Sequence, residues 1–280
     1  PVRTMAGMKV LKHTVDSFTV HEFVPAEEAL ATVIAVHPWA ALGGGEHNVI
    51  GIARELAAAR FSVLTFQLKS SSMVWGVLAA HSAEVAQVVQ VGRWALSQLP
   101  PRPLVLLGAS AGAPIAGSAL EQLPSAAGYV GIGYTWGWLA AVGFGRHFGA
   151  IQRSATPKLF IQGETDEFTS PTTLRRAVER ANGSRNDVLI VPKVGHFELE
   201  QPAFDELVAQ HVIAWLLPVV TSATQQLGHN DESGAAGSSA AVGAAGSSAA
   251  HAQDGLKEQA AVRQAAEGKA AEGVELGEVG

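Results

Sequence analysis

Residues 104–112 read LVLLGASAG, and this stretch carries the strongest structural signal in the chain. An apolar, β-prone run ends at Gly108, Ser110 lies between two glycines, and residues 113–122 are compatible with a helix. This strand–turn–helix pattern predicts a sharp turn with the Ser110 hydroxyl exposed at its apex, where it can attack a carbonyl group. Gly108 and Gly112 remove side chains that would collide where strand and helix fold back on each other.

The G-x-S-x-G pattern by itself is weak, because Gly, Ala and Ser are abundant in this chain and the pentapeptide could arise by chance. The expected strand before Ser110 and the expected helix after it supply the structural context that the motif requires.

Apolar runs and amphipathic segments alternate along the chain around this motif. The expected strands cover residues 31–36, 61–66, 104–107, 129–133, 158–162 and 187–191, and the expected helices cover residues 47–60, 82–99, 113–122, 171–182 and 202–217. Near-continuous apolar strands between amphipathic helices are typical of a mostly parallel sheet covered on both faces. We therefore expect a three-layer α/β fold. About two dozen residues separate positions 133 and 158, which leaves no room for a large cap domain.

The composition divides the chain at Pro218. Residues 1–218 contain all the aromatic residues and read as one folded domain. Residues 219–280 are rich in Ala, Gly and Ser, and GAAGSSAA occurs in them twice, at 234–241 and 243–250. Such a segment buries too little apolar surface to offset its ordering entropy, so we expect a disordered tail.

Charge and cysteine content exclude several classes of function. The formal net charge is −6, of which −5 lies in the tail, and this argues against nucleic acid as a partner. The chain has no cysteine, which excludes disulfides and thiolate chemistry. No dinucleotide, phosphate or metal motif stands out, so we expect no cofactor and no metal. His13 and His21 with Asp16 and Glu22 could form a metal site, but a strand hairpin with scattered polar residues is the simpler interpretation.

Residues 126–145 form an uncharged window of the length that a membrane span needs. The window contains six glycines, so we interpret it as a buried strand and a loop, and we expect no membrane span. The alanine-rich composition fits the cytoplasm or a plastid. The chain begins at Pro1 and can lack its original N-terminus, which leaves the compartment open.

Polar residues with catalytic chemistry follow four of the expected strands: the His37-Pro38-Trp39 segment, Ser110, Asp166 and His196. The carboxyl ends of parallel strands meet at one edge of a sheet, so these residues should lie close together. A serine nucleophile needs an imidazole base and a carboxylate that orients it.

Two assignments have competitors in the sequence. Glu164 and Glu167 flank Asp166, and an acidic loop is usually a solvated turn. His196 competes with nine other histidines, among which His37 is more suited to bracing a loop than to acting as the base.

The chain resembles the α/β-hydrolase superfamily over residues 8–217. The resemblance is carried by the turn at Ser110, the G-x-x-D element at Gly163 and Asp166, and the Gly195-His196 pair. The loop H-P-aromatic-x-x-x-G-G that starts at His37 is similar to that of uncharacterised plant and algal hydrolases, and a more distant similarity is to dienelactone-hydrolase-like enzymes. The chain order serine, aspartate, histidine is the order of this fold.

The resemblance implies Ser110 as nucleophile, Asp166 as acid and His196 as base. It also implies an oxyanion hole formed by the backbone N–H groups of Ala111 and Trp39. The alternative for Trp39 is a flexible surface loop with a buried ring.

Trp136, Trp138, Phe144 and Phe148 could line a substrate pocket or could equally pack in the core. The function expected from all these features is a serine hydrolase that cleaves a small carboxyl ester or thioester through an acyl-enzyme. The alternatives are a non-catalytic ligand-binding protein of the same fold, and an acyltransferase or peptidase with the same triad. The oligomeric state stays open.

Overall fold

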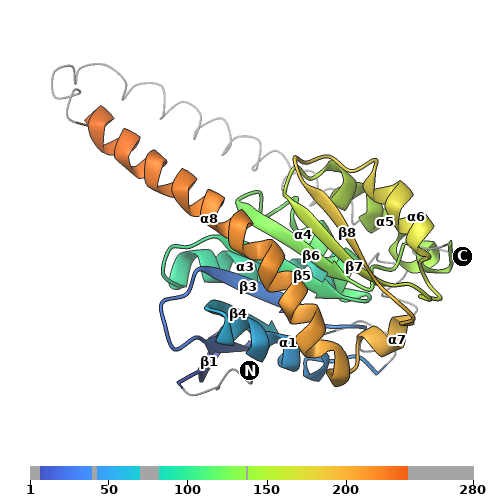
Figure 1. Cartoon of the computed structure of the whole chain (residues 1–280). Helices are drawn as coiled ribbons and strands as arrows, with labels where there is room; N and C mark the ends of the chain where they lie inside the picture. Colours follow the sequence, from blue (N-terminus) through green and yellow to red (C-terminus); the bar gives the residue numbers. More distant parts are fainter. Residues whose placement is uncertain (1–6, 40–42, 70–81, 137, 239–280) are drawn as a thin grey trace, which may run out of the picture. The chain divides into compact units, whose positions relative to one another are not determined.

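The computed structural model describes residues 7–39, 43–69, 82–136 and 138–238. Eight strands form one sheet in the order β1-β2-β4-β3-β5-β6-β7-β8 (Figure 1). The strands are β1 Lys9–Val15, β2 Phe18–Val24, β3 Ala31–Val36, β4 Phe61–Phe66, β5 Leu104–Ala109, β6 Ala126–Ile132, β7 Lys158–Gly163 and β8 Asn186–Val191. β2 runs antiparallel to both of its neighbours, and the strands from β4 to β8 pair in parallel.

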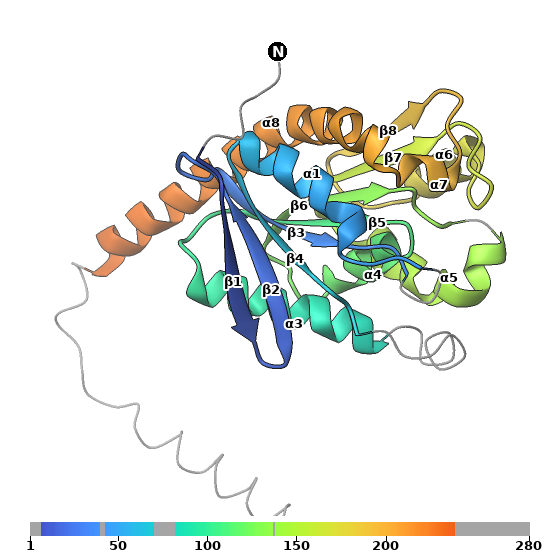
Figure 2. The same ribbon diagram turned by 90° about the horizontal axis from the view of Figure 1, so that it is seen from below.

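Helices cover the sheet on both faces, as the view turned by 90° shows (Figure 2). The helices are α1 His47–Ala58, α3 Ser82–Gln98, α4 Gly112–Ala119, α5 Trp138–Arg153, α6 Pro171–Val178, α7 His196–Leu199, the 3-10 turn Pro202–Phe204 and α8 Asp205–Ser238. Core residues of α1 and α8 form one cluster with the sheet, and those of α3, α4 and α6 form another.

The strands are apolar throughout because both of their faces are buried. On β5, Leu104 and Leu106 join the cluster under α3 and α4, whereas Val105 and Leu107 join the cluster under α1 and α8. Continuous apolar runs are the expected sequence of strands that are covered twice. The three-layer α/β class predicted from the sequence is therefore confirmed, and each predicted strand is present with ends within three residues of the expected ones.

The hairpin of β1 and β2 carries the histidines that could have formed a metal site. His13 Nε2 lies 2.8 Å from a Glu22 carboxylate oxygen, and His21 Nδ1 lies 2.7 Å from Glu46. Ser62 Oγ donates to the second oxygen of Glu22 at 2.7 Å. These histidines thus belong to two separate pairs, and the described residues contain no group of three His, Asp or Glu side chains that could hold a metal ion.

Helix α8 differs from the sequence prediction, which ended the helix at Leu217. The helix continues through Pro218 to Ser238. Val219 and Val220 are buried in the same cluster as Trp215, so their packing offsets the cost of about 3 kcal/mol that a proline inside a helix carries. The expected helix end is wrong because Pro218 is unfavourable in a helix locally, whereas the burial of Val219 and Val220 favours continuation of the helix.

The chain divides into two compact units, Pro1–Leu227 and Gly228–Gly280. The first unit extends past the expected boundary at Pro218. Residues 239–280, most of the expected tail, lie outside the described residues.

The segment Pro202–Gln226 is long and apolar enough to cross a membrane by length and composition alone. Its buried side chains, including Val208, Val212 and Leu216, belong to the core cluster under the sheet. About a third of the apolar window, 33%, is buried in this way, and a single helix of this length and composition is weak evidence for a membrane span. The uncharged window 126–145 contains strand β6 and the start of α5.

Replacement of Pro218 by alanine tests the continuation of α8. Inside a helix, Pro218→Ala restores a backbone N–H and should raise the free energy of unfolding by about 1–3 kcal/mol in chemical denaturation. The neighbouring Leu217→Ala, at a side chain that is 41% exposed, should have a small effect. A lower stability of Pro218→Ala would instead place the proline in a loop, where it restricts the unfolded chain.

Candidate active site

Ser110 occupies the turn between β5 and α4 with a φ of 52°, in the left-handed region. Its backbone N–H donates to the carbonyl of Ile132 at 2.8 Å, and its own carbonyl accepts from the Ala113 N–H at 3.0 Å. A non-glycine residue in this region costs roughly 1–2 kcal/mol, which these hydrogen bonds and the packing around the turn must offset. The side chain is half-buried at the carboxyl end of the sheet.

The two glycines around Ser110 allow this turn. A Cβ at Gly108 would lie 2.3 Å from the carbonyl oxygen of Gly112. A Cβ at Gly112 would lie 2.4 Å from the carbonyl oxygen of His37. The first glycine therefore lets strand and helix fold back on each other, and the second lets α4 approach the end of β3.

The structure brings Ser110, His196 and Asp166 together from three strand ends. Ser110 Oγ lies 2.8 Å from His196 Nε2, and His196 Nδ1 lies 2.6 Å from Asp166 Oδ2. The other carboxylate oxygen of Asp166 accepts the backbone N–H groups of Phe168 and Thr169 at 2.9 and 2.7 Å. The carboxylate is thus held by three hydrogen bonds and directed at the imidazole ring.

The competing acidic residues have other partners. Glu164 accepts the backbone N–H of Lys193 at 2.9 Å, and Glu167 accepts the backbone N–H of His196 at 3.1 Å. The latter hydrogen bond lowers the pKa of Glu167. Asp166 is the acid of the three whose carboxylate contacts the ring, as the spacing of the motif predicts.

A second carboxylate, which the sequence analysis did not identify, also reaches this ring. Glu200 Oε1 lies 3.3 Å from His196 Nε2. His196 begins the short helix α7, so the two residues are one turn apart. The sequence predicts no helix between residues 191 and 202, and the i,i+4 spacing of His196 and Glu200 becomes a contact only because α7 forms there.

His196 has an altered affinity for protons in this environment. Burial of the ring by itself lowers the pKa of His196, but the hydrogen bonds and charges of Asp166 and Glu200 outweigh burial and raise the pKa to about 9. Gly133, with a φ of 57°, ends β6 beside the ring, and a Cβ there would lie 3.3 Å from His196 Cε1.

The expected oxyanion-hole residues lie near each other. Ala111 belongs to a small apolar cluster with Phe144, and Trp39 packs against this cluster with its ring centroid 6.0 Å from that of Phe144. Ala111 is also the N-cap of α4, where backbone N–H groups lack partners within the helix.

His37 braces the loop that carries Trp39. The backbone N–H of Leu68 donates to His37 Nε2 at 2.9 Å, so the ring proton resides on Nδ1 and is donated to the Pro38 carbonyl at 2.5 Å. Burial lowers the pKa of His37, which favours this neutral form. The arrangement matches a bracing role and leaves no ring nitrogen for Ser110.

The aromatic residues proposed for a substrate pocket have different positions. Trp136 stacks on Phe148 at 4.9 Å between centroids and packs against the main core cluster, which favours the core alternative. Trp138 begins α5, and its side chain lies outside the described residues. Phe144, by contrast, lies beside Ala111.

Further apolar side chains contact the imidazole of His196. The ring of Phe168 lies 4.6 Å from that of His196, and Phe197 lies 5.6 Å from Phe168. Phe197 is 56% exposed directly beside a buried histidine. Apolar rings thus lie beside His196 and beside Ala111, the residue that follows Ser110.

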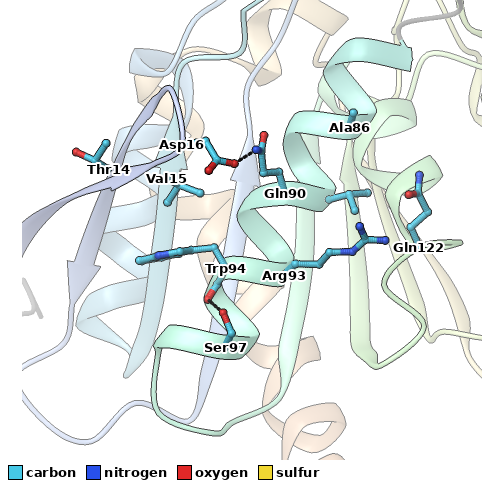
Figure 3. A pocket seen from close by; sticks show the side chains of 10 residues that line it. Thr14, Val15, Asp16, Ala86, Gln90, Arg93, Trp94, Ser97 and Gln122 are labelled. Atoms are coloured by element: carbon cyan, nitrogen blue, oxygen red, sulfur yellow. Dashed lines mark hydrogen bonds between the residues drawn. The ribbon is translucent and has the colours of Figure 1, made fainter.

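An open groove of about 690 Å³ lies elsewhere, between the β1–β2 turn and α3 (Figure 3). Asp16 and Gln90 face each other across it and are joined by a hydrogen bond. The groove contains none of Ser110, Asp166 and His196. It holds no nucleophile–base pair, so we assign the chemistry to the sheet edge.

No protein-family model matches the chain, and no curated protein matches it. Among solved structures, the chain is similar to an α/β serine hydrolase without a lid from Xanthomonas campestris, with a TM-score of 0.60 and 23% identity over 76% of this chain and 96% of that one. It is also similar to an α/β serine hydrolase homologue from Coxiella burnetii, with a TM-score of 0.59 and 17% identity over 74% and 97% of the two chains.

An esterase from Pyrococcus furiosus aligns with a TM-score of 0.56 and 18% identity over 75% of this chain and 90% of that one. These comparisons and the sheet order show that the chain has the α/β-hydrolase fold.

Substitution of Gly112 tests the close approach of α4 to β3. In Gly112→Ala the added Cβ meets backbone oxygens that cannot rotate away, so we expect the free energy of unfolding to fall by about 1–3 kcal/mol or more. Gly128→Ala is the matched control, because its Cβ would make ordinary contacts at 3.4 Å or longer. Equal stability of the two variants, measured by urea unfolding, would refute this account of the elbow.

Proposed function

We propose that this protein is a serine hydrolase that cleaves a small carboxyl ester or thioester through an acyl-enzyme. The observation that carries the proposal is the continuous chain of contacts from Ser110 Oγ to His196 Nε2 at 2.8 Å and from His196 Nδ1 to Asp166 at 2.6 Å. Three separate strand ends supply these residues, and their spacing supports the roles of nucleophile for Ser110, base for His196 and orienting acid for Asp166.

In the first step, Ser110 Oγ attacks the substrate carbonyl carbon while its proton moves to His196 Nε2. The carbonyl π electrons move to the oxygen, which becomes an oxyanion. When the tetrahedral intermediate collapses, the bond to the leaving oxygen or sulfur breaks, and the leaving group takes the proton from Nε2. Water then attacks the acyl carbon and gives a proton to His196 Nε2. When this second intermediate collapses, the bond from the acyl carbon to Ser110 Oγ breaks, the carboxylic acid leaves, and Oγ takes the proton back from Nε2.

Asp166 fixes the tautomer that this sequence of steps requires. Its carboxylate accepts a hydrogen bond from the Nδ1–H group, so the lone pair of the neutral ring lies on Nε2 and faces Ser110. The carboxylate also stabilises the imidazolium that forms when His196 accepts the serine proton.

The N–H groups of Ala111 and Trp39 are the proposed donors to the oxyanion. Each such donor contributes roughly 3 kcal/mol to the stability of the transition state. The proposal is supported by the packing of Trp39 against the Ala111–Phe144 cluster and by the hydrogen bond from His37 to Pro38.

The apolar rings around the site favour a neutral substrate with an apolar acyl or alcohol group. Phe144 and Trp39 lie on the Ala111 side, and Phe168 and Phe197 lie on the His196 side. The neighbours described as serine hydrolases and esterases support the same class of reaction. Transfer of the acyl group to an alcohol or amine instead of water would use the same residues.

Loss of the Ser110 hydroxyl should abolish the reaction. Ser110→Ala should show no hydrolysis of short p-nitrophenyl esters above background, with an unchanged circular dichroism spectrum, and a fluorophosphonate probe should label the wild type at Ser110 alone. Ser118→Ala is the matched control, because Ser118 Oγ also contacts a histidine, His147 Nδ1, at 2.6 Å. Full activity of Ser110→Ala would contradict the proposal.

Loss of the Asp166 charge should slow the chemical step. An amide at this position favours the wrong tautomer of His196, so Asp166→Asn should reduce kcat by about 10⁴-fold with a small change in KM. Glu164→Gln removes an exposed acid of the same loop and should leave kcat within about twofold. Steady-state kinetics compare the two variants, and a similar kcat in both would exclude Asp166 as the orienting acid.

A further inference from the structure

Helix α7 brings a second carboxylate to the nitrogen of His196 that takes part in the proposed reaction. Glu200 follows the last residue of this helix, four positions after His196, and its side chain is 12% exposed. Its Oε1 lies 3.3 Å from His196 Nε2, and this oxygen makes no hydrogen bond to any other described residue. A largely buried carboxylate oxygen is therefore directed at the imidazole ring.

This position makes Glu200 sensitive to the protonation state of His196. Asp166 occupies Nδ1, so Nε2 is a lone pair in the neutral ring and an N–H group in the imidazolium. A carboxylate repels the lone pair and attracts the N–H group, and it therefore favours the charged ring. Ser110 Oγ, the other neighbour of Nε2, is neutral and tolerates both forms.

We propose that Glu200 is a positioning residue that stabilises the proton which His196 takes from Ser110 at Nε2. The inference rests on the proposed function and adds a second carboxylate to its machinery. Asp166 and Glu200 then stabilise the imidazolium from its two nitrogen atoms. When the tetrahedral intermediate collapses, the same proton moves from Nε2 to the leaving group, and Glu200 again lies beside a neutral ring.

The groups that face the His196 ring are those that can shift its pKa. Ser110 faces the ring from the elbow, Gly133 from the end of β6, Asp166, Glu167 and Phe168 from the loop after β7, and Phe197 and Glu200 from α7. The titratable side chains among them are all acidic. Glu167 is exposed and contacts the backbone of His196, whereas Asp166 and Glu200 contact the ring itself.

The stabilisation has a cost in the free enzyme. With a pKa raised to about 9, His196 is protonated at neutral pH and must lose its proton before it can act as a base. kcat/KM should therefore rise with pH and level off above about 9 in the wild type.

The effect of removing the Glu200 charge depends on pH. At a pH below the pKa of His196, the free enzyme already holds the imidazolium. Glu200 then stabilises the free enzyme and the transition state equally, so it does not change kcat/KM. Where the free enzyme holds a neutral ring, Glu200 stabilises the transition state alone. In Glu200→Gln, kcat/KM should therefore reach its plateau at a lower pH, and the plateau value should be lower than in the wild type. At acidic pH, kcat/KM should change little.

The size of the change follows from a single charge at this distance. An opposite charge within about 4–6 Å shifts a pKa by about 1–3 units. Glu200→Gln should lower the pKa of His196 by at least about one unit, and each unit should lower the upper plateau of kcat/KM by up to tenfold.

The test is a titration of the imidazole by NMR on protein labelled with ¹⁵N-histidine, combined with the pH profile of p-nitrophenyl ester hydrolysis. The His196 signal is identified by its loss in His196→Gln. Glu200→Asp retains the charge and should keep part of the raised pKa. Glu206→Gln removes an exposed acid from the first turn of α8 and is the charge-matched control.

A lower pKa of His196 in Glu200→Gln alone, with a matching shift of the pH profile, supports the proposal. An unchanged pKa overturns it, and so does a lower pKa with an unchanged pH profile. The titration needs no turnover, so it separates this inference from the proposed function. If the wild type neither hydrolyses esters nor reacts with the fluorophosphonate probe, the proposed function fails, and the titration still decides whether Glu200 controls the protonation of His196.

Discussion

The left-handed backbone of Ser110 is the constraint on which the candidate site depends. The turn can form because Gly108 and Gly112 have no side chains at the two points where backbones meet. The second of these contacts holds the start of α4 against the end of β3. The Ser110 turn therefore lies next to the loop that contains Trp39. A serine hydroxyl at any other point of this sheet edge would lack both the imidazole and the candidate oxyanion donors.

The parallel sheet then determines what lies around Ser110. β6 lies next to β5, β7 next to β6 and β8 next to β7, so the segments that follow these strands meet at one edge. Gly133 leaves space for the imidazole, the loop after β7 supplies Asp166, and the segment after β8 supplies His196. Residues far apart in the chain become neighbours because successive strands are neighbours.

The sequence alone predicts much of this arrangement. Continuous apolar runs are a reliable signal for strands such as β5, because both faces of a covered parallel strand must be apolar. The order of Ser110, Asp166 and His196 after three such runs predicts the contacts that the structure contains. These predictions succeed where the local pattern and the tertiary environment demand the same residues.

The predictions fail where tertiary packing decides. Pro218 is a helix breaker by itself, and the burial of Val219 and Val220 that outweighs it appears only when α8 lies on the sheet. Glu200 is one of several acids in the sequence, and its proximity to His196 depends on the short helix α7. Nothing in the spacing of strands distinguishes Trp136, which packs in the core, from an aromatic residue at the site.

The central claim is that Ser110 becomes covalently acylated during turnover. Rapid acid quench of the wild type with p-nitrophenyl acetate, followed by peptide mass spectrometry, tests it directly. We expect one acetyl group on the peptide that contains Ser110, formed as fast as the first turnover releases p-nitrophenol. Ester hydrolysis without an acetylated peptide, or with the acetyl group on another residue, would contradict it.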